Sequence, residues 1–185
     1  QDGVLFSSPD GKTWTIAYDR APWRGRTSAG CIVFEGRVWV MGGKGKNHEL
    51  LNDVWSSPDG MHWTRELLHA PWPARQMHHA PVELDGRMWL LGGGVSNSDY
   101  HPFAAWNDVW SSADGKHWER SLDHAPWIPR IWGASAAYRD RMWIIGGFRS
   151  EPRWENLGDV WYSSNGVDWR QLEVLPRIWH SGEKG

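Results

Sequence analysis

The sequence has one cysteine, little net charge and no long apolar run. With Cys31 alone, the chain has neither an internal disulfide nor a cysteine-rich zinc site. Its formal net charge of −2 gives no reason to expect a nucleic acid partner. No apolar run approaches the roughly 20 residues that cross a bilayer as a helix, which excludes such a membrane span. Cys31 starts the apolar segment 31–34, so we expect it to be a small buried hydrophobic residue.

Tryptophan, by contrast, is abundant and periodic. The chain has 17 tryptophans, and most of them recur with a spacing of about 50 residues, which indicates a repeat architecture. The periodic positions form four sets: Trp14, Trp63, Trp118 and Trp169; Trp39, Trp89 and Trp143; Trp55, Trp110 and Trp161; Trp23, Trp72 and Trp127. A ring that recurs in every repeat is a packing element. Specific function must therefore be sought in residues that break the pattern.

Each repeat contains four short apolar segments bounded by turn residues. The second segment ends in paired glycines (37–43, 87–93 and 141–147), and the third begins with Asp-Val-Trp (53–57, 108–112 and 159–163). The segments are rich in β-branched and aromatic residues and lack the helical period of 3.6 residues. Acid–glycine pairs such as Asp85-Gly86 suit tight hairpin turns. The sequence thus predicts an all-β chain with four antiparallel strands per repeat, the pattern of a propeller blade.

These motifs resemble kelch repeats, which build β-propellers. The segment 8–14, Ser-Pro-Asp-Gly-Lys-Thr-Trp, also looks like the Asp-box turn of sialidases. The turn recurs at 57–63 and 112–118, with Asn165 in place of the aspartate in the last copy. In sialidases these turns lie away from the catalytic site, so the resemblance implies a structural role for Asp10, Asp59 and Asp114. A structural role is also expected for the acids that begin the third segments, Asp53, Asp108 and Asp159.

The repeats divide residues 1–185, a single kelch-type propeller segment, into about three and a half blades. The expected parts are a half blade (1–20), three blades (26–70, 75–125 and 130–175) and the start of another blade (176–185). Because open sheet edges and an unclosed core are unfavourable in water, two alternatives stay open. Either the chain is a piece of a longer protein that supplies the other blades, or copies of it assemble as a homo-oligomer into a closed ring.

The blade topology places the long and variable loops 44–52, 94–107 and 148–158 on one face, where binding specificity is expected. Each inter-blade loop ends with an arginine on that face: Arg26, Arg75, Arg130 and Arg177. Arginines that converged on the mouth of a central channel would bind a carboxylate or phosphate by bidentate hydrogen bonds. In the structural alternative, they pair with the acids that begin the third segments.

Aromatic residues on the same face form the second candidate set. Trp106 and Trp154 lie in the variable loops, outside the repeat pattern, and Trp132 and Trp179 closely follow two of the arginines. Rings exposed near polar groups suit sugar binding, although they could instead cover apolar residues of their own loops. His78 stands at a strand entry on this face. No metal-binding spacing accompanies it, so we expect no metal and no other cofactor.

We expect a non-catalytic binding module whose loop-bearing face recognises a glycan or a protein partner. The resemblance also implies two enzyme alternatives. One is a sialic acid mutarotase-like enzyme, in which the arginines would hold the carboxylate of an acidic sugar. The other is a galactose oxidase-like enzyme, which needs a Cys–Tyr crosslink and is disfavoured by a lone Cys31 in an apolar strand. Bacterial proteins of this resemblance are commonly exported, which implies a secreted or periplasmic location.

Overall fold

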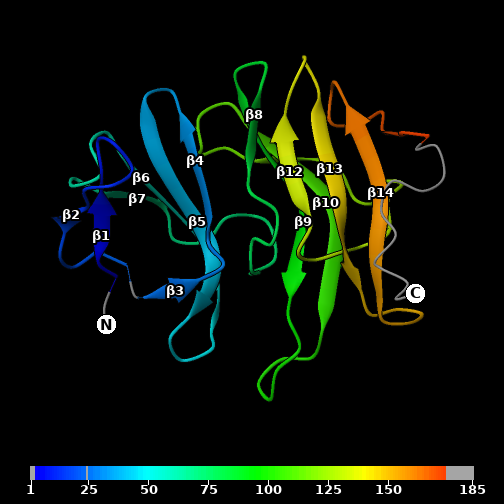
Figure 1. Cartoon of the computed structure of the whole chain (residues 1–185), viewed down its shortest axis with the longest axis horizontal. Coiled ribbons are helices and arrows are strands. Elements are labelled where there is room, and N and C mark those ends of the chain that lie inside the picture. Colours follow the sequence, from blue (N-terminus) through cyan, green and yellow to red (C-terminus); the bar gives the residue numbers. More distant parts are fainter. Residues whose placement is uncertain (1–2, 24, 174–185) are drawn as a thin grey trace, which may run out of the picture.

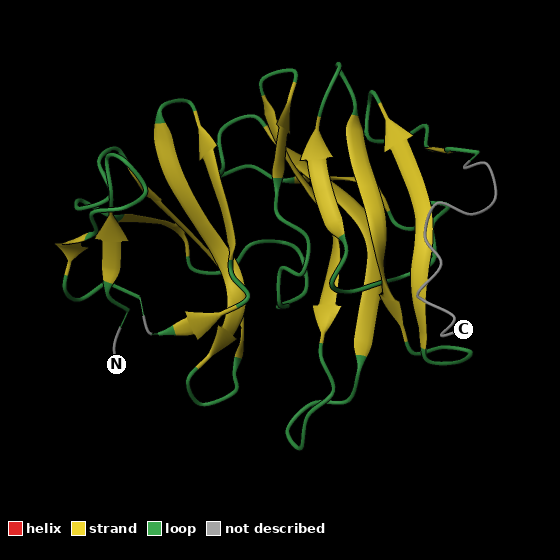
Figure 2. Cartoon of the chain, viewed as in Figure 1, coloured by secondary structure: helices red, strands yellow, loops and turns green. Residues whose placement is uncertain are grey.

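The chain folds into β-strands only. The computed structural model describes residues 3–23 and 25–173, and no helix occurs among them. It follows that no helix in this part of the chain is long and apolar enough to cross a membrane. Figure 2 shows strands joined by loops throughout.

The strands form four antiparallel sheets, each built from consecutive segments of the chain. The first sheet pairs β1 (Leu5–Ser7) with β2 (Thr15–Tyr18). The second contains β3 (Arg26–Thr27), β4 (Gly30–Phe34), β5 (Arg37–Gly45), β6 (Leu50–Ser57) and β7 (Thr64–Leu67). The third contains β8 (Val82–Leu84), β9 (Arg87–Val95), β10 (Ala104–Ser112) and β11 (Glu119–Leu122). The fourth contains β12 (Ala134–Ala137), β13 (Met142–Arg149), β14 (Glu155–Ser163) and β15 (Arg170–Gln171).

This architecture confirms the predicted all-β class with blade-like units. Within the third and fourth sheets, the strand order follows the chain order. In the second sheet β3 and β4 both pair with β5, so together they take the place of one first strand. The sheets stand in a row in Figure 1, from β1 and β2 on the left to β14 on the right. Hairpin turns gather at the upper edge, and the longer loops β5–β6, β9–β10 and β13–β14 gather at the lower edge.

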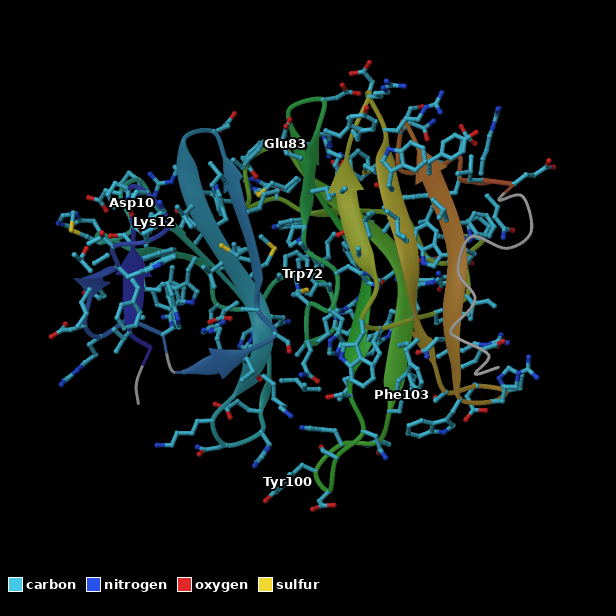
Figure 3. All side chains as sticks on the ribbon, in the orientation of Figure 1. Asp10, Lys12, Trp72, Glu83, Tyr100 and Phe103 are labelled. Atoms are coloured by element: carbon cyan, nitrogen blue, oxygen red, sulfur yellow. The ribbon has the colours of Figure 1, made fainter. Side chains whose placement is uncertain are left out.

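Tryptophan rings fill the spaces between neighbouring sheets. Trp72 lies between the second and third sheets (Figure 3), with ring centroids 6.4 Å from Trp110 and 4.5 Å from Trp118. Trp127 repeats the arrangement one sheet further on, 4.2 Å from Trp169. Edge-to-face contacts at these distances add to the stabilisation from burying large apolar rings. Most of the periodic tryptophans therefore pack between sheets, whereas Trp14 in the turn of the first sheet stays 60% exposed.

The turn between the third and fourth strand of each repeat is held by its own polar side chains. In the turn after β6, Asp59 Oδ1 accepts the backbone N–H groups of Met61 and His62, each at 2.8 Å. Ser57 Oγ accepts the N–H of Gly60, whose φ of +77° favours glycine. The first copy of the turn is built in the same way. There the N–H groups of Thr13 and Lys12 lower the pKa of Asp10 to about 2.

The paired glycines let two backbone segments approach closely. Gly92 and Gly93 have φ values of +62° and +112°. A Cβ on Gly93 would lie 3.0 Å from the carbonyl oxygen of Gln76 and 3.2 Å from Cδ of Arg75. A larger residue would displace the segment that carries the repeated arginine, which explains why glycine recurs here.

Cys31 is exposed, and the prediction that it is buried was wrong. Side chains alternate along β4, so Phe34 is buried whereas Cys31 and Val33 lie on the opposite face. The neighbouring sheet on that side has only two strands. Its Leu5 packs with the cluster of Trp23 and Trp55, and the face of β4 with Val33, which is 68% exposed, stays uncovered.

Candidate functional site

Three of the arginines that end the inter-blade loops, Arg26, Arg75 and Arg130, lie in the described part of the chain. Each forms a bidentate ion pair with the aspartate that begins the third segment of its repeat. The guanidinium nitrogens of Arg75 lie 2.6 and 2.7 Å from the carboxylate oxygens of Asp108. The Arg75 side chain also donates to the carbonyl oxygens of Pro73 and Gly92, each at 3.1 Å. Asp108 accepts a further hydrogen bond from the Trp110 indole at 2.8 Å. Arg26 with Asp53 and Arg130 with Asp159 repeat the pattern.

These ion pairs are buried between the repeated β-sheets. The side chains of Arg75 and Arg130 are 0% exposed, and that of Arg26 is 5% exposed. Burial opposes ionisation of Asp53, but hydrogen bonds from Arg26 and Trp55 outweigh it, and the pKa of Asp53 is lowered. The guanidinium groups of Arg75 and Arg130 are paired and fully buried, so they have no surface for a ligand. The two terminal nitrogens of Arg26 bind Asp53, although its Nε has no hydrogen-bond partner. We therefore propose no ligand role for these three arginines, while Arg177 and Trp179 lie outside the described residues.

The variable loops enclose a cleft at the lower edge of the molecule. The cleft has a volume of about 570 Å³ and lies between the β9–β10 loop and the β13–β14 loop. Trp106 and Trp154, the two tryptophans outside the repeat pattern, both line it, together with Phe103 (labelled in Figure 3). Arg149 and Glu151 contribute polar groups to the same lining. Two rings that are 48 residues apart in the sequence thus meet at one surface hollow.

Trp106 is held in place by the frame. It pairs with Gly93 across the β9–β10 ladder, and the Arg75 side chain passes close to Gly93, 3.2 Å from the position of a Cβ. The guanidinium carbon of Arg75 lies 4.6 Å from the centre of the Trp106 ring. A cation over an indole face attracts it electrostatically, so Arg75 fixes this ring from behind.

Phe148 connects the other aromatic residues of the site. Its ring centroid lies 5.4 Å from Trp132, 5.4 Å from Trp154 and 6.1 Å from Phe103. Trp154 remains 66% exposed despite these contacts. Phe148 was missed in the sequence. The available signal was its position directly after a glycine pair, where the other repeats have Lys44 and Gly94.

His78 lies at the edge of this aromatic cluster and is neutral at pH 7. Its ring contacts Trp132 edge to face, with centroids 5.8 Å apart. Burial lowers the pKa of His78 to about 4, with smaller contributions from the nearby positive charges of His79 and Lys44. Its Nε2 is buried without a hydrogen-bond partner. His78 does not line the cleft, so the structure places it behind the candidate site.

Charged groups beside the cleft are arranged in a small network. Glu155 bonds with Arg149, whose Nε lies 2.9 Å from Oε2, and with Arg153 at 3.1 Å. These hydrogen bonds, that from Arg149 foremost, lower the pKa of Glu155. Arg149 is thereby held at the lining of the cleft. Across residues 3–23 and 25–173, no group of histidine, cysteine or acidic side chains is arranged to hold a metal ion.

Neither the models of known protein families nor the curated proteins include a match to this chain.

Proposed function

We propose that this chain is a non-catalytic, sugar-binding module of the kelch-type β-propeller class. The repeat motifs and the blade-like sheets support the class. The meeting of Trp106 and Trp154 in one cleft is the single observation that supports the ligand. A glycan ligand also agrees with the expected secreted or periplasmic location.

The lining of the cleft suits a neutral sugar. Aromatic faces bind the apolar C–H face of a pyranose ring, while a few polar groups at the rim bond its hydroxyls and fix its orientation. Trp106 and Trp154 supply the faces, and Arg149 and Glu151 supply polar groups of opposite charge. A concave site with one ring on β10 and one on the β13–β14 loop favours a small ligand over the flat surface of a protein partner.

The acidic-sugar enzyme gains no support from the geometry. In that enzyme the repeated arginines would bind the carboxylate of the sugar. Arg75 and Arg130, however, have no exposed side-chain surface. Arg149 is the remaining arginine at the cleft, and its charge is already paired with Glu155. We therefore keep non-catalytic recognition as the proposed function.

A glycan array followed by titration calorimetry tests the proposal. We expect binding to neutral glycans, with an affinity that falls at least about tenfold in Trp154→Ala, because a loss of about 1.4 kcal/mol corresponds to that factor. Tyr100→Ala is the matched control, since Tyr100 lies on the β9–β10 loop, is 63% exposed and does not line the cleft. Absence of binding to every neutral glycan, or equal losses in both variants, would refute the proposal.

A further inference from the structure

The two ends of the row of sheets each expose an apolar face. At the end formed by the fourth sheet, Tyr138 is 59% exposed and Ile145 45% exposed, next to the half-buried Trp143. At the other end, Phe6 and Trp14 of the first sheet and its turn are 57% and 60% exposed. The two sheets stand at opposite ends of the row in Figure 1, where β1 and β14 mark them.

The contacts between the inner sheets show what each face is built to pack against. Trp39 of β5 lies against Gly115, in the turn of the following sheet, so closely that a Cβ on Gly115 would clash with the ring. Trp89 of β9 lies against Gly166 in the same way. Each contact therefore places the second-strand tryptophan of one sheet on the turn glycine of the next.

Trp143 is the third member of this series, and no described turn receives it. Trp39 and Trp89 are 3% and 6% exposed, whereas Trp143 is only half-buried. Among the four turn glycines, Gly11 and Gly60 have nothing within 4 Å of the position that a Cβ would take. Within residues 3–23 and 25–173, one tryptophan of this series and two of these turns are thus unmatched.

The surrounding side chains repeat the same mismatch. Ile145 is 45% exposed, although its counterparts Met41 and Leu91 are 0% and 1% exposed. On the receiving side, Phe6 and Trp14 take the places that Trp110 and Trp118 take in the third sheet. Trp110 and Trp118 are 7% and 8% exposed because they pack in one cluster with Trp39 and Met41.

We propose that two copies of this chain associate head to tail, with Trp143 of each copy on the Gly11 turn of the other. One chain carries both parts of the contact at opposite ends: the face around Trp143 and the Gly11 turn. Each part has the same kinds of residues that pack against one another between the inner sheets. A contact between unlike faces closes when two copies exchange it reciprocally, which gives a ring with two-fold symmetry. The occupant is a second copy because the exposed face needs this turn with its aromatic neighbours, and the chain itself supplies it.

The mass in solution, measured by sedimentation equilibrium, tests the association. We expect twice the 21.3 kDa of one chain. Because the ring contains the contact twice, Trp143→Ala should weaken dimerisation at least about a hundredfold. Gly11→Asn should also give the monomer, since asparagine tolerates the φ of +72° but its side chain would occupy the place of the partner's indole.

Gly60→Asn is the matched control. Gly60 has a φ of +77°, the same kind of turn and the same open space, but no tryptophan reaches it in the proposed pair. We expect this variant to dimerise as the unaltered chain does.

A monomer at the highest soluble concentration would overturn the proposal, as would a dimer that persists in Gly11→Asn. Equal losses in the Gly11 and Gly60 variants, or a mass that grows without limit, would also overturn it. Sugar binding measured on the monomeric variants is a separate readout, so the two proposals fail independently.

Discussion

Replacing Arg75 by methionine should destabilise the chain strongly. Methionine fills a similar volume but removes the charge and every hydrogen bond of the guanidinium. Asp108 would keep the Trp110 indole as its side-chain donor while staying almost as buried as before, with a side chain that is 8% exposed. The carbonyl oxygen of Gly92 would also lose the hydrogen bond from Arg75.

The magnitude follows from the cost of leaving a charge buried without its partner. Breaking a buried ion pair from one side typically costs about 3–5 kcal/mol, whereas replacing both partners with apolar residues is often close to neutral. We therefore expect Arg75→Met to lower the free energy of unfolding by about 3–5 kcal/mol. The double variant Arg75→Met with Asp108→Leu should recover most of that loss.

The assay is urea unfolding followed by tryptophan fluorescence, at one fixed protein concentration. Arg26→Met provides a matched comparison, because its partner Asp53 is more exposed, at 14%, and can regain water more easily. We expect a smaller loss there than for Arg75. A loss below about 1 kcal/mol in Arg75→Met would refute the reasoning, because that is the range of an exposed pair. So would a double variant that is less stable than the single one.

Three further predictions concern the turns, the pH dependence and the aromatic cluster. Asp114→Ala should lower the free energy of unfolding, measured by thermal melting, by about 1 kcal/mol, because two backbone N–H groups of the turn lose their acceptor. Asp114→Asn should be nearly neutral, since Asn165 fills the same place in the last repeat. The pKa of His79 is lowered from 6.5 to about 4, chiefly by burial, so the unfolded chain binds more protons between these values. The stability that depends on His79 should therefore be fully present above pH 6.5 and fall as the pH drops towards 4, by up to about 1.4 kcal/mol per pH unit, and His78, with the same lowered pKa, adds to this slope. A urea series that shows no such slope, or the same slope in His79→Gln, would contradict this. Phe148→Ala should weaken sugar binding several-fold in calorimetry by loosening Trp154, and unchanged affinity would exclude Phe148 from positioning that ring.

The repeated parts of the fold could be predicted from the sequence because the same strand patterns and turn residues recur in every repeat. Paired glycines with positive φ, such as Gly92 and Gly93, mark an irregularity inside every second strand, which continues beyond them to Val95 in β9. The exposure of Cys31 could not be predicted in this way. It depends on how many strands the neighbouring sheet presents, which is a property of packing between sheets and not of the apolar segment itself.

The candidate site was only partly predictable for a related reason. Trp106 and Trp154 stood out because they break the repeat, and the structure places both in one cleft. The repeated arginines were ambiguous, since an arginine can bind a ligand or an internal carboxylate with the same bidentate geometry. Burial decides between these roles, and burial depends on the closeness of segments such as Gly93 and Arg75.

The repeated frame and the singular site are physically linked through Arg75. Its guanidinium binds Asp108, which orders the frame, and also lies over the Trp106 ring, which lines the cleft. In the other repeats the residues at the place of Trp106 are Leu51 and Leu157, and Arg26 lies instead 5.8 Å from the centre of the Trp23 ring. Under the proposed function, Trp106 beside this buried cation and Trp154 on a variable loop together supply the sugar-binding surface, and the repeated sheets need no change.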